Sequence, residues 1–218
     1  LCCTLAALGF IVVSLEGRGC PRRSKAYQDH KFGDISASNE PDDHVAGIRE
    51  LARTRPYMDI SRVGISGSDA NSAIYGFLKH PDFYKAAVIQ FFLDPVDSIP
   101  QIVEKYNGLS PNHSGLNRSR PMDHYAADVE GKLLLINGMY EFQTPAGAFR
   151  LVEALQKANK DFDMLMLPRC GTDPTSYTIR KDWDHMVKHL QNVTPPKNFK
   201  IEMGFESMDE EALHDQFF

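Results

Sequence analysis

Apolar positions along the chain follow two spacings. Short apolar runs rich in β-branched residues, bounded by glycine, proline or polar residues, predict buried strands. These runs cover residues 10–15, 62–65, 86–92, 132–136 and 162–167. Between them, apolar residues recur every three or four positions, which is the period of an amphipathic helix. The helical segments cover residues 41–55, 71–80, 145–158 and 177–190.

The order of these elements predicts the fold class. Strand and helix alternate five times, which is typical of an α/β domain with a mostly parallel sheet and helices on both faces. We expect one such domain over residues 1–196, with a mostly irregular stretch at 95–125, and a polar, acidic tail of little order over 197–218. The chain opens inside an apparent helix without an initiator methionine, so we expect it to be a piece of a longer protein.

Composition and charge exclude several classes of function. The 218 residues are 42% apolar, enough for one globular core, and the net charge of -5 gives no reason to expect nucleic acid or an anionic membrane as partner. No apolar stretch is long enough to span a membrane. A basic cluster at residues 18–25 indicates a solvated loop. The cysteines form neither a zinc site nor a disulfide framework by their spacing; they are Cys2, Cys3, Cys20 and Cys170.

Three predicted strands end in residues that suggest chemistry. In an open parallel sheet, ligands bind at the carboxyl ends of the strands. Residues 66–69 follow the second strand, Glu141 follows the fourth and Thr172 follows the fifth. A nucleophile on a tight strand-to-helix turn, then an acid, then a third residue is the chain order of the α/β-hydrolase triad.

Five ordered segments carry a more specific resemblance. They are LAALGFIVVSLEGRGCPRRSKAY (5–27), DDHVAGIRELARTRPYMDISRVGI (42–65), HPDFYKAAV (80–88), GKLLLINGMYE (131–141) and RKDWDHMVKHL (180–190). With them the chain resembles the catalytic domain of the prolyl oligopeptidase family of serine peptidases, in its dipeptidyl-peptidase IV branch. The resemblance implies the α/β-hydrolase fold, here without its first strands.

The resemblance places the nucleophile position at a degenerate turn. Counting forward from Met58 puts Asp69 where the family has its catalytic serine, and the family's glycine pair is missing. Ser68 is the second choice for the nucleophile, and Ser66 is the third because it would shorten the strand. The family's first oxyanion donor would be the backbone N–H of Ala70, or of Asp69 in the second register.

The other triad positions also depart from the family. Glu141 stands in place of the acid and keeps its charge, whereas Thr172 stands where the family has histidine. Threonine cannot accept the serine proton at neutral pH. The tyrosine that supplies the family's second oxyanion donor and the family's propeller domain have no counterpart in this chain.

Two histidines near the end of the chain could suggest a metal. His185 and His189 stand one helical turn apart, which is half of a metal site, but no third ligand is evident from the sequence. We therefore interpret them as residues of a helix surface, and His44 as structural. No metal and no cofactor are expected.

These features favour a catalytically inactive homologue of the peptidase domain. The alternative is an active serine hydrolase that uses Ser68, Glu141 and an unidentified base, whose substrate by resemblance would be a peptide with proline or alanine next to its amino terminus. A hydrolase with a carboxylate nucleophile at Asp69 is the least favoured of the three functions considered. The resemblance allows a homodimer through the C-terminal helix. It leaves the compartment open, since family members are often periplasmic, secreted or membrane-anchored through upstream signals.

Overall fold

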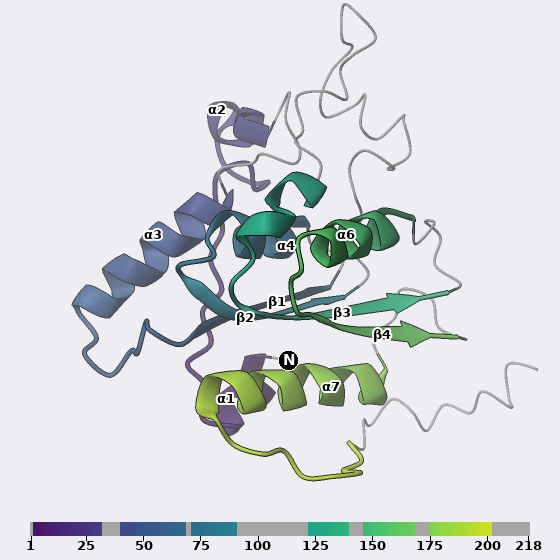
Figure 1. The fold of residues 1–218 in the computed structure, drawn as a ribbon. Helices are drawn as coiled ribbons and strands as arrows, with labels where there is room; N and C mark the ends of the chain where they lie inside the picture. Colours follow the sequence, from purple (N-terminus) through teal and green to yellow (C-terminus); the bar gives the residue numbers. More distant parts are fainter. Residues whose placement is uncertain are drawn as a thin grey trace, which may run out of the picture.

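The computed structural model confirms the α/β class. It describes residues 2–31, 40–68, 71–90, 122–139, 146–168 and 175–201. Four parallel strands form one sheet in the order β1-β2-β3-β4 (Figure 1). Their bounds are Val63–Ser68 for β1, Tyr84–Gln90 for β2, Lys132–Gly138 for β3 and Asp163–Leu167 for β4. The register joins Ser66 to Val88 and Gln90 to Ile136, so the strand ends meet at one edge.

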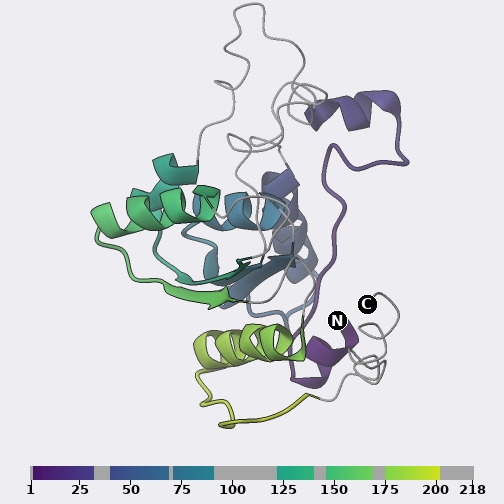
Figure 2. The same ribbon diagram turned by 90° about the vertical axis from the view of Figure 1, so that its right-hand side faces the viewer.

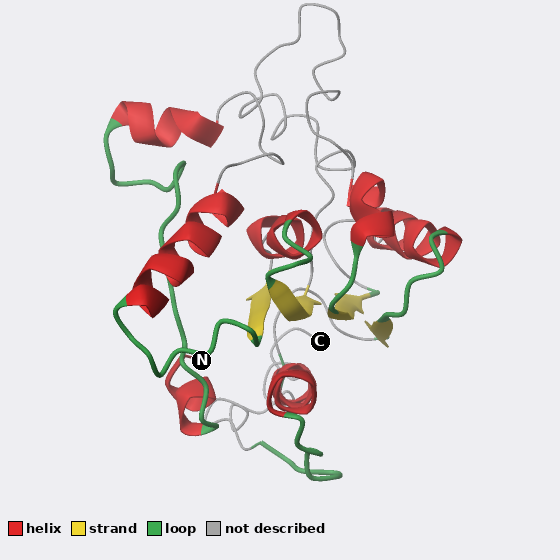
Figure 3. Cartoon of the chain, turned by 60° about the vertical axis from the view of Figure 1, so that its left-hand side comes forward, coloured by secondary structure: helices red, strands yellow, loops and turns green. Residues whose placement is uncertain are grey.

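Helices cover both faces of this sheet, as the alternation of elements predicts. One face carries α3 (Glu40–Arg53), α4 (Asn71–Lys79), the 3-10 helix η3 (Met122–Asp128) and α6 (Ala146–Lys157) (Figure 1). The other carries α1 (Cys2–Ala7) and α7 (Ser176–Met186), which continues into the π-helical segment η4 (Val187–Gln191). Figures 2 and 3 show the sheet between these two layers.

The two faces of the sheet build two cores of unequal size. Successive strand residues point to opposite faces, so each strand contributes to both. Ala87 and Ile89 of β2 face the larger core with α4 and α6, whereas Ala86 and Val88 face the smaller core beneath α7. On the helix side, Met186 and Leu190 provide the buried apolar residues of that smaller core. The last helix is therefore held by few apolar side chains.

The segment 10–15 is not a strand, in contrast to its β-branched sequence. It runs without regular structure, and a cavity of about 600 Å³ lies between it and β1. Its apolar side chains remain partly open to solvent, with Ile11 52% exposed and Leu15 36% exposed. A strand needs a hydrogen-bonded neighbour, and none of the described residues pairs with this segment.

Other differences are smaller. Two short helices, α2 (Lys25–Gln28) and η1 (Asp29–Lys31), occur where the sequence predicts a loop, and η3 extends into the expected irregular stretch. β1 reaches Ser68, three residues beyond its predicted end, while β2 begins two residues early at Tyr84. Among the described residues, no helix combines the length and apolarity needed to cross a membrane.

Candidate functional site at the carboxyl end of the sheet

The predicted nucleophile positions fall where strand β1 passes into helix α4. β1 ends at Ser68 and α4 begins at Asn71, so the two-residue connection is formed by Asp69 and Ala70. Asp69, Ala70, Glu141 and Thr172 lie outside the described residues, and of Ser68 only the backbone is described. Their assignment to a triad therefore stays a prediction, although a strand-to-helix connection is where the motif requires a nucleophile.

Ser66 lies inside β1 and not on the turn. Its backbone pairs with Val88 of β2, and its side chain points toward α7. The Ser66 hydroxyl donates a 2.6 Å hydrogen bond to Oδ2 of Asp182. A nucleophile needs an exposed position on the sharp turn and a base that takes its proton. Ser66 is exposed but lies within the strand, so its position does not favour the third register, and the choice of nucleophile stays a prediction.

Asp182 is a buried carboxylate that sequence reasoning missed. It lies on α7, is 1% exposed, and accepts hydrogen bonds from Ser66 and, at 3.3 Å, from Nε2 of Gln90 at the end of β2. Burial raises the pKa of Asp182 to about 6, and the two hydrogen bonds offset only part of that effect. The sequence spacing could have revealed this burial, because Asp182 lies four residues before Met186 and eight before Leu190, on the apolar face of the helix.

The cluster around Asp182 has more acceptors than donors. Within the part of the chain that the structure describes, Oδ1 of Asp182 and Oε1 of Gln90 are buried without a hydrogen-bond partner. A protonated carboxyl group would add one O–H donor to this cluster. The arrangement therefore favours the neutral acid, in agreement with the raised pKa.

Histidines with a described hydrogen bond have their partners elsewhere. Nε2 of His44 lies 3.0 Å from the carbonyl of Leu15, and Nε2 of His80 lies 2.8 Å from Asp42. His185 contacts the carbonyl of Lys132 at the amino end of β3, at the opposite edge of the sheet from Gln90. Among the described residues, no imidazole is hydrogen-bonded to Ser66. The structural interpretation of His44 agrees with its contact.

The glycine-rich loop after residue 15 supports the start of α3. Arg18 makes a bidentate ion pair with Asp43, with Nη2 2.7 Å from Oδ1. Its guanidinium lowers the pKa of the Asp43 carboxyl. A Cβ on Gly17 would stand 2.8 Å from Cα of Glu40, so this position needs glycine for the loop to reach α3. Glu40 in turn accepts a 2.7 Å hydrogen bond from Ser72 of α4. Arg18 therefore has a scaffold role next to the candidate site.

The four-stranded parallel sheet with helices on both faces is an α/β architecture, and solved structures identify it as that of the α/β-hydrolase peptidases. Dipeptidyl peptidase 4 of Porphyromonas gingivalis superimposes with a TM-score of 0.72 at 18% identity, over 80% of this chain and 26% of that one. Acylaminoacyl peptidase of Pyrococcus horikoshii superimposes with a TM-score of 0.65 at 17% identity, over 84% of this chain and 32% of that one.

The chain belongs to the prolyl oligopeptidase family, whose model matches residues 2–192. Among curated proteins it is similar to dipeptidyl peptidase 8 of Mus musculus and of Homo sapiens, each 23% identical over 209 residues. Those matches cover 86% of this chain and 21% of the relatives, so the chain spans about a fifth of their length. The family that the sequence resembles is therefore confirmed, and both of these curated relatives are dipeptidyl peptidases.

Proposed function

We propose that this chain keeps the fold of a prolyl-oligopeptidase-family peptidase domain without its hydrolytic activity. The sequence feature that carries the proposal is the departure of both proton-transfer partners from the family: in the favoured register Asp69 falls at the serine position, and Thr172 falls at the histidine position. Without a base beside the nucleophile, a serine hydroxyl is a weak nucleophile, and loss of a triad member costs several powers of ten in rate.

The contacts of the described residues support this proposal. Ser66, the one motif serine whose side chain is described, donates a hydrogen bond to Asp182 and lies within a strand. The hydrogen bonds described for His44, His80 and His185 go to Leu15, Asp42 and Lys132, and none of them goes to Ser66. A family member without activity would serve as a binding or assembly module on this scaffold.

The competing function is an active serine hydrolase with Ser68 as nucleophile and Glu141 as acid. The observation in its favour is that β1 ends at Ser68, immediately before the connection to α4. Its substrate class would be that of the dipeptidyl peptidases, a peptide cleaved near its amino terminus.

A fluorophosphonate probe separates the two functions, because it forms an adduct only with an activated serine. The folded protein is labelled beside an active dipeptidyl peptidase, and any adduct is located by mass spectrometry. We expect no adduct on this protein. An adduct on Ser68 that is lost in Ser68→Ala but kept in Ser66→Ala would refute inactivity and establish the hydrolase.

A gain-of-function variant tests the register itself. Asp69→Ser combined with Thr172→His restores the family's nucleophile and base in the first register, while Asp69→Ser alone supplies no base. We expect labelling at position 69 in the double variant and not in the single variant. If the single variant Asp69→Ser is labelled at position 69 as strongly as the double variant, the chain already holds a base, and the proposal is contradicted.

A further inference from the structure

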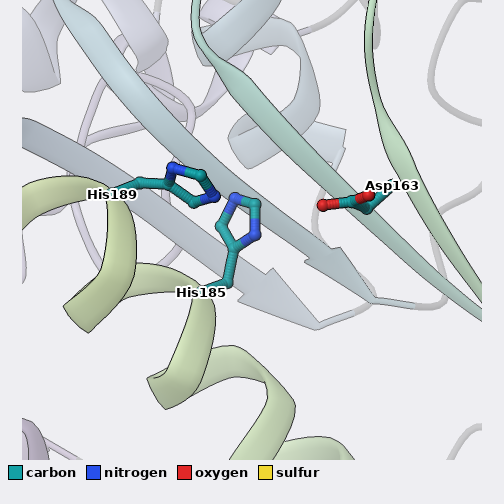
Figure 4. A group of neighbouring side chains, drawn as sticks. All are labelled: Asp163, His185 and His189. Atoms are coloured by element: carbon teal, nitrogen blue, oxygen red, sulfur yellow. The ribbon is translucent and has the colours of Figure 1, made fainter. Parts of the chain in front are cut away.

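A second group of polar side chains lies at the edge of the sheet opposite the candidate active site. Asp163 is the first residue of β4, while His185 and His189 come from α7 and the adjoining segment η4. One ligand atom from each residue can be chosen so that all three lie within 4.8 Å of one another. In the view of Figure 4 the imidazole ring of His185 lies between the ring of His189 and the carboxylate of Asp163. His185 is buried, which corrects its interpretation as a helix-surface residue.

We propose that Asp163, His185 and His189 form a binding site for a divalent transition-metal ion, with Zn²⁺ the best matched. Two imidazole nitrogens and one carboxylate oxygen are a common zinc donor set, and they disfavour Mg²⁺ and Ca²⁺, which prefer oxygen ligands alone. A water molecule would complete four-coordination, since the Asp163 side is open to solvent.

The hydrogen bond of His185 prepares this ring for a metal. Its Nε2 lies 3.1 Å from the backbone oxygen of Lys132. A carbonyl oxygen only accepts, so Nε2 carries the proton of the neutral ring and Nδ1 keeps a free lone pair. Metal-binding histidines characteristically donate their second ring N–H to a carbonyl or carboxylate in this way, which fixes the tautomer and the ring orientation.

The second ring lies close enough to bind the same ion. The ring centroids of His185 and His189 are 4.5 Å apart. Ligand atoms in a tetrahedral zinc site, at the usual bond lengths, lie about 3.3 Å from one another. The group is therefore slightly wider than a loaded site. The exposed Asp163 and the partly exposed His189 can close the gap by side-chain rotation, while the buried His185 stays fixed.

The charges around the group set limits on its affinity. Burial lowers the pKa of His185 and of His189. The ammonium groups of Lys132 and Lys188 repel a cation here, and the Asp163 carboxylate attracts it. With one carboxylate against two ammonium groups, we expect micromolar rather than nanomolar affinity for zinc.

Calorimetry of the intact, metal-stripped protein with ZnCl₂ tests the site. His189→Gln and Asp163→Asn each remove one ligand from a partly or fully exposed position, and His124→Gln on η3 is the matched control because its ring is also exposed. His185 is left in place because its buried ring donates a hydrogen bond to the backbone oxygen of Lys132, and its loss would disturb the fold. We expect one zinc ion per chain, weakened about 10–100-fold by His189→Gln and several-fold by Asp163→Asn. His124→Gln should bind like the wild type.

A second measurement keeps folding apart from binding. Each variant should melt in EDTA within a few degrees of the wild type, while zinc at about a hundred times its Kd should raise the wild-type Tm by about 5–10 °C. Co²⁺ in place of Zn²⁺ should give the visible absorption of four-coordination. The proposal is overturned if the wild type binds no zinc, or if either ligand variant binds it as tightly as the wild type. None of these readouts depends on hydrolytic activity.

Discussion

Replacing Asp182 with asparagine should stabilise the protein more at neutral pH than in mild acid. Asparagine has the same shape, can still accept from Ser66 and Gln90 through its amide oxygen, and carries no charge. The wild-type carboxyl has its pKa raised to about 6 in the fold by burial, against an ordinary value of 3.8. Between these two values the native state holds a proton that the unfolded state has lost, so wild-type stability falls as the pH rises through this window.

The size of the effect follows from the same pKa shift. For a carboxyl that titrates near 6 in the fold, the wild type loses about 2 kcal/mol of stability relative to Asp182→Asn between about pH 4.5 and pH 7.5. For a chain of this length that difference corresponds to about 4–8 °C in Tm. Burial lowers the pKa of His185 and His189 and produces the opposite trend with pH, but it acts equally in both proteins and cancels in the difference.

Urea denaturation followed by circular dichroism across this pH range measures the difference directly. The m-value must stay constant, so that a change in midpoint reports stability alone. Asp184→Asn is the matched control, since it removes an aspartate from the same helix whose carboxylate is partly exposed and lies 3.5 Å from Arg180. A stability difference between wild type and Asp182→Asn that does not change with pH would refute the reasoning that Asp182 is a buried, titrating carboxyl.

Two further substitutions test how α7 is held on the sheet. Gly64→Ala should destabilise the protein by about 1–3 kcal/mol in urea denaturation. The new Cβ would stand 2.7 Å from Cδ1 of Leu190 and 2.9 Å from Sδ of Met186. An unchanged midpoint would show that α7 does not approach β1 so closely. Thr175→Ala should cost about 1 kcal/mol and lower Tm by a few degrees, since Thr175 and Thr178 form the capping box at the start of this helix. Thr175→Ser keeps the cap and should leave Tm nearly unchanged.

The periodic parts of the sequence predicted the fold well. The helices at 71–79 and 146–157 lie within two residues of their predicted bounds because their apolar residues repeat with a single strong period. The prediction of a strand over residues 10–15 was wrong for a physical reason. Its β-branched residues favour an extended chain, yet strand formation depends on a pairing partner that local sequence does not encode.

The sites were predicted less completely than the fold. Residues at the strand ends predict a site at the carboxyl end of the sheet, and that stays a prediction. Asp182 reaches this end from a helix distant in sequence, because α7 packs on β1 and β2. Similarly, the spacing of His185 and His189 resembles half a metal site, although from the sequence alone both are interpreted as helix-surface residues. The third residue of the proposed site is Asp163. Its position beside the two histidines depends on the β3–β4 register and on the packing of α7 over both strands, which the pattern of one segment cannot reveal.

The smaller core beneath α7 predicts that this helix opens separately from the rest of the fold. Few buried apolar residues hold it there, so it should detach at a lower free energy than global unfolding, as cooperative units do in hydrogen exchange. Its release would free Asp182 from burial and let the carboxyl ionise. Above the pKa of about 6, the open form gains the hydration of that charge, so alkaline conditions favour opening. We therefore expect α7 to detach more easily as the pH rises through about 6.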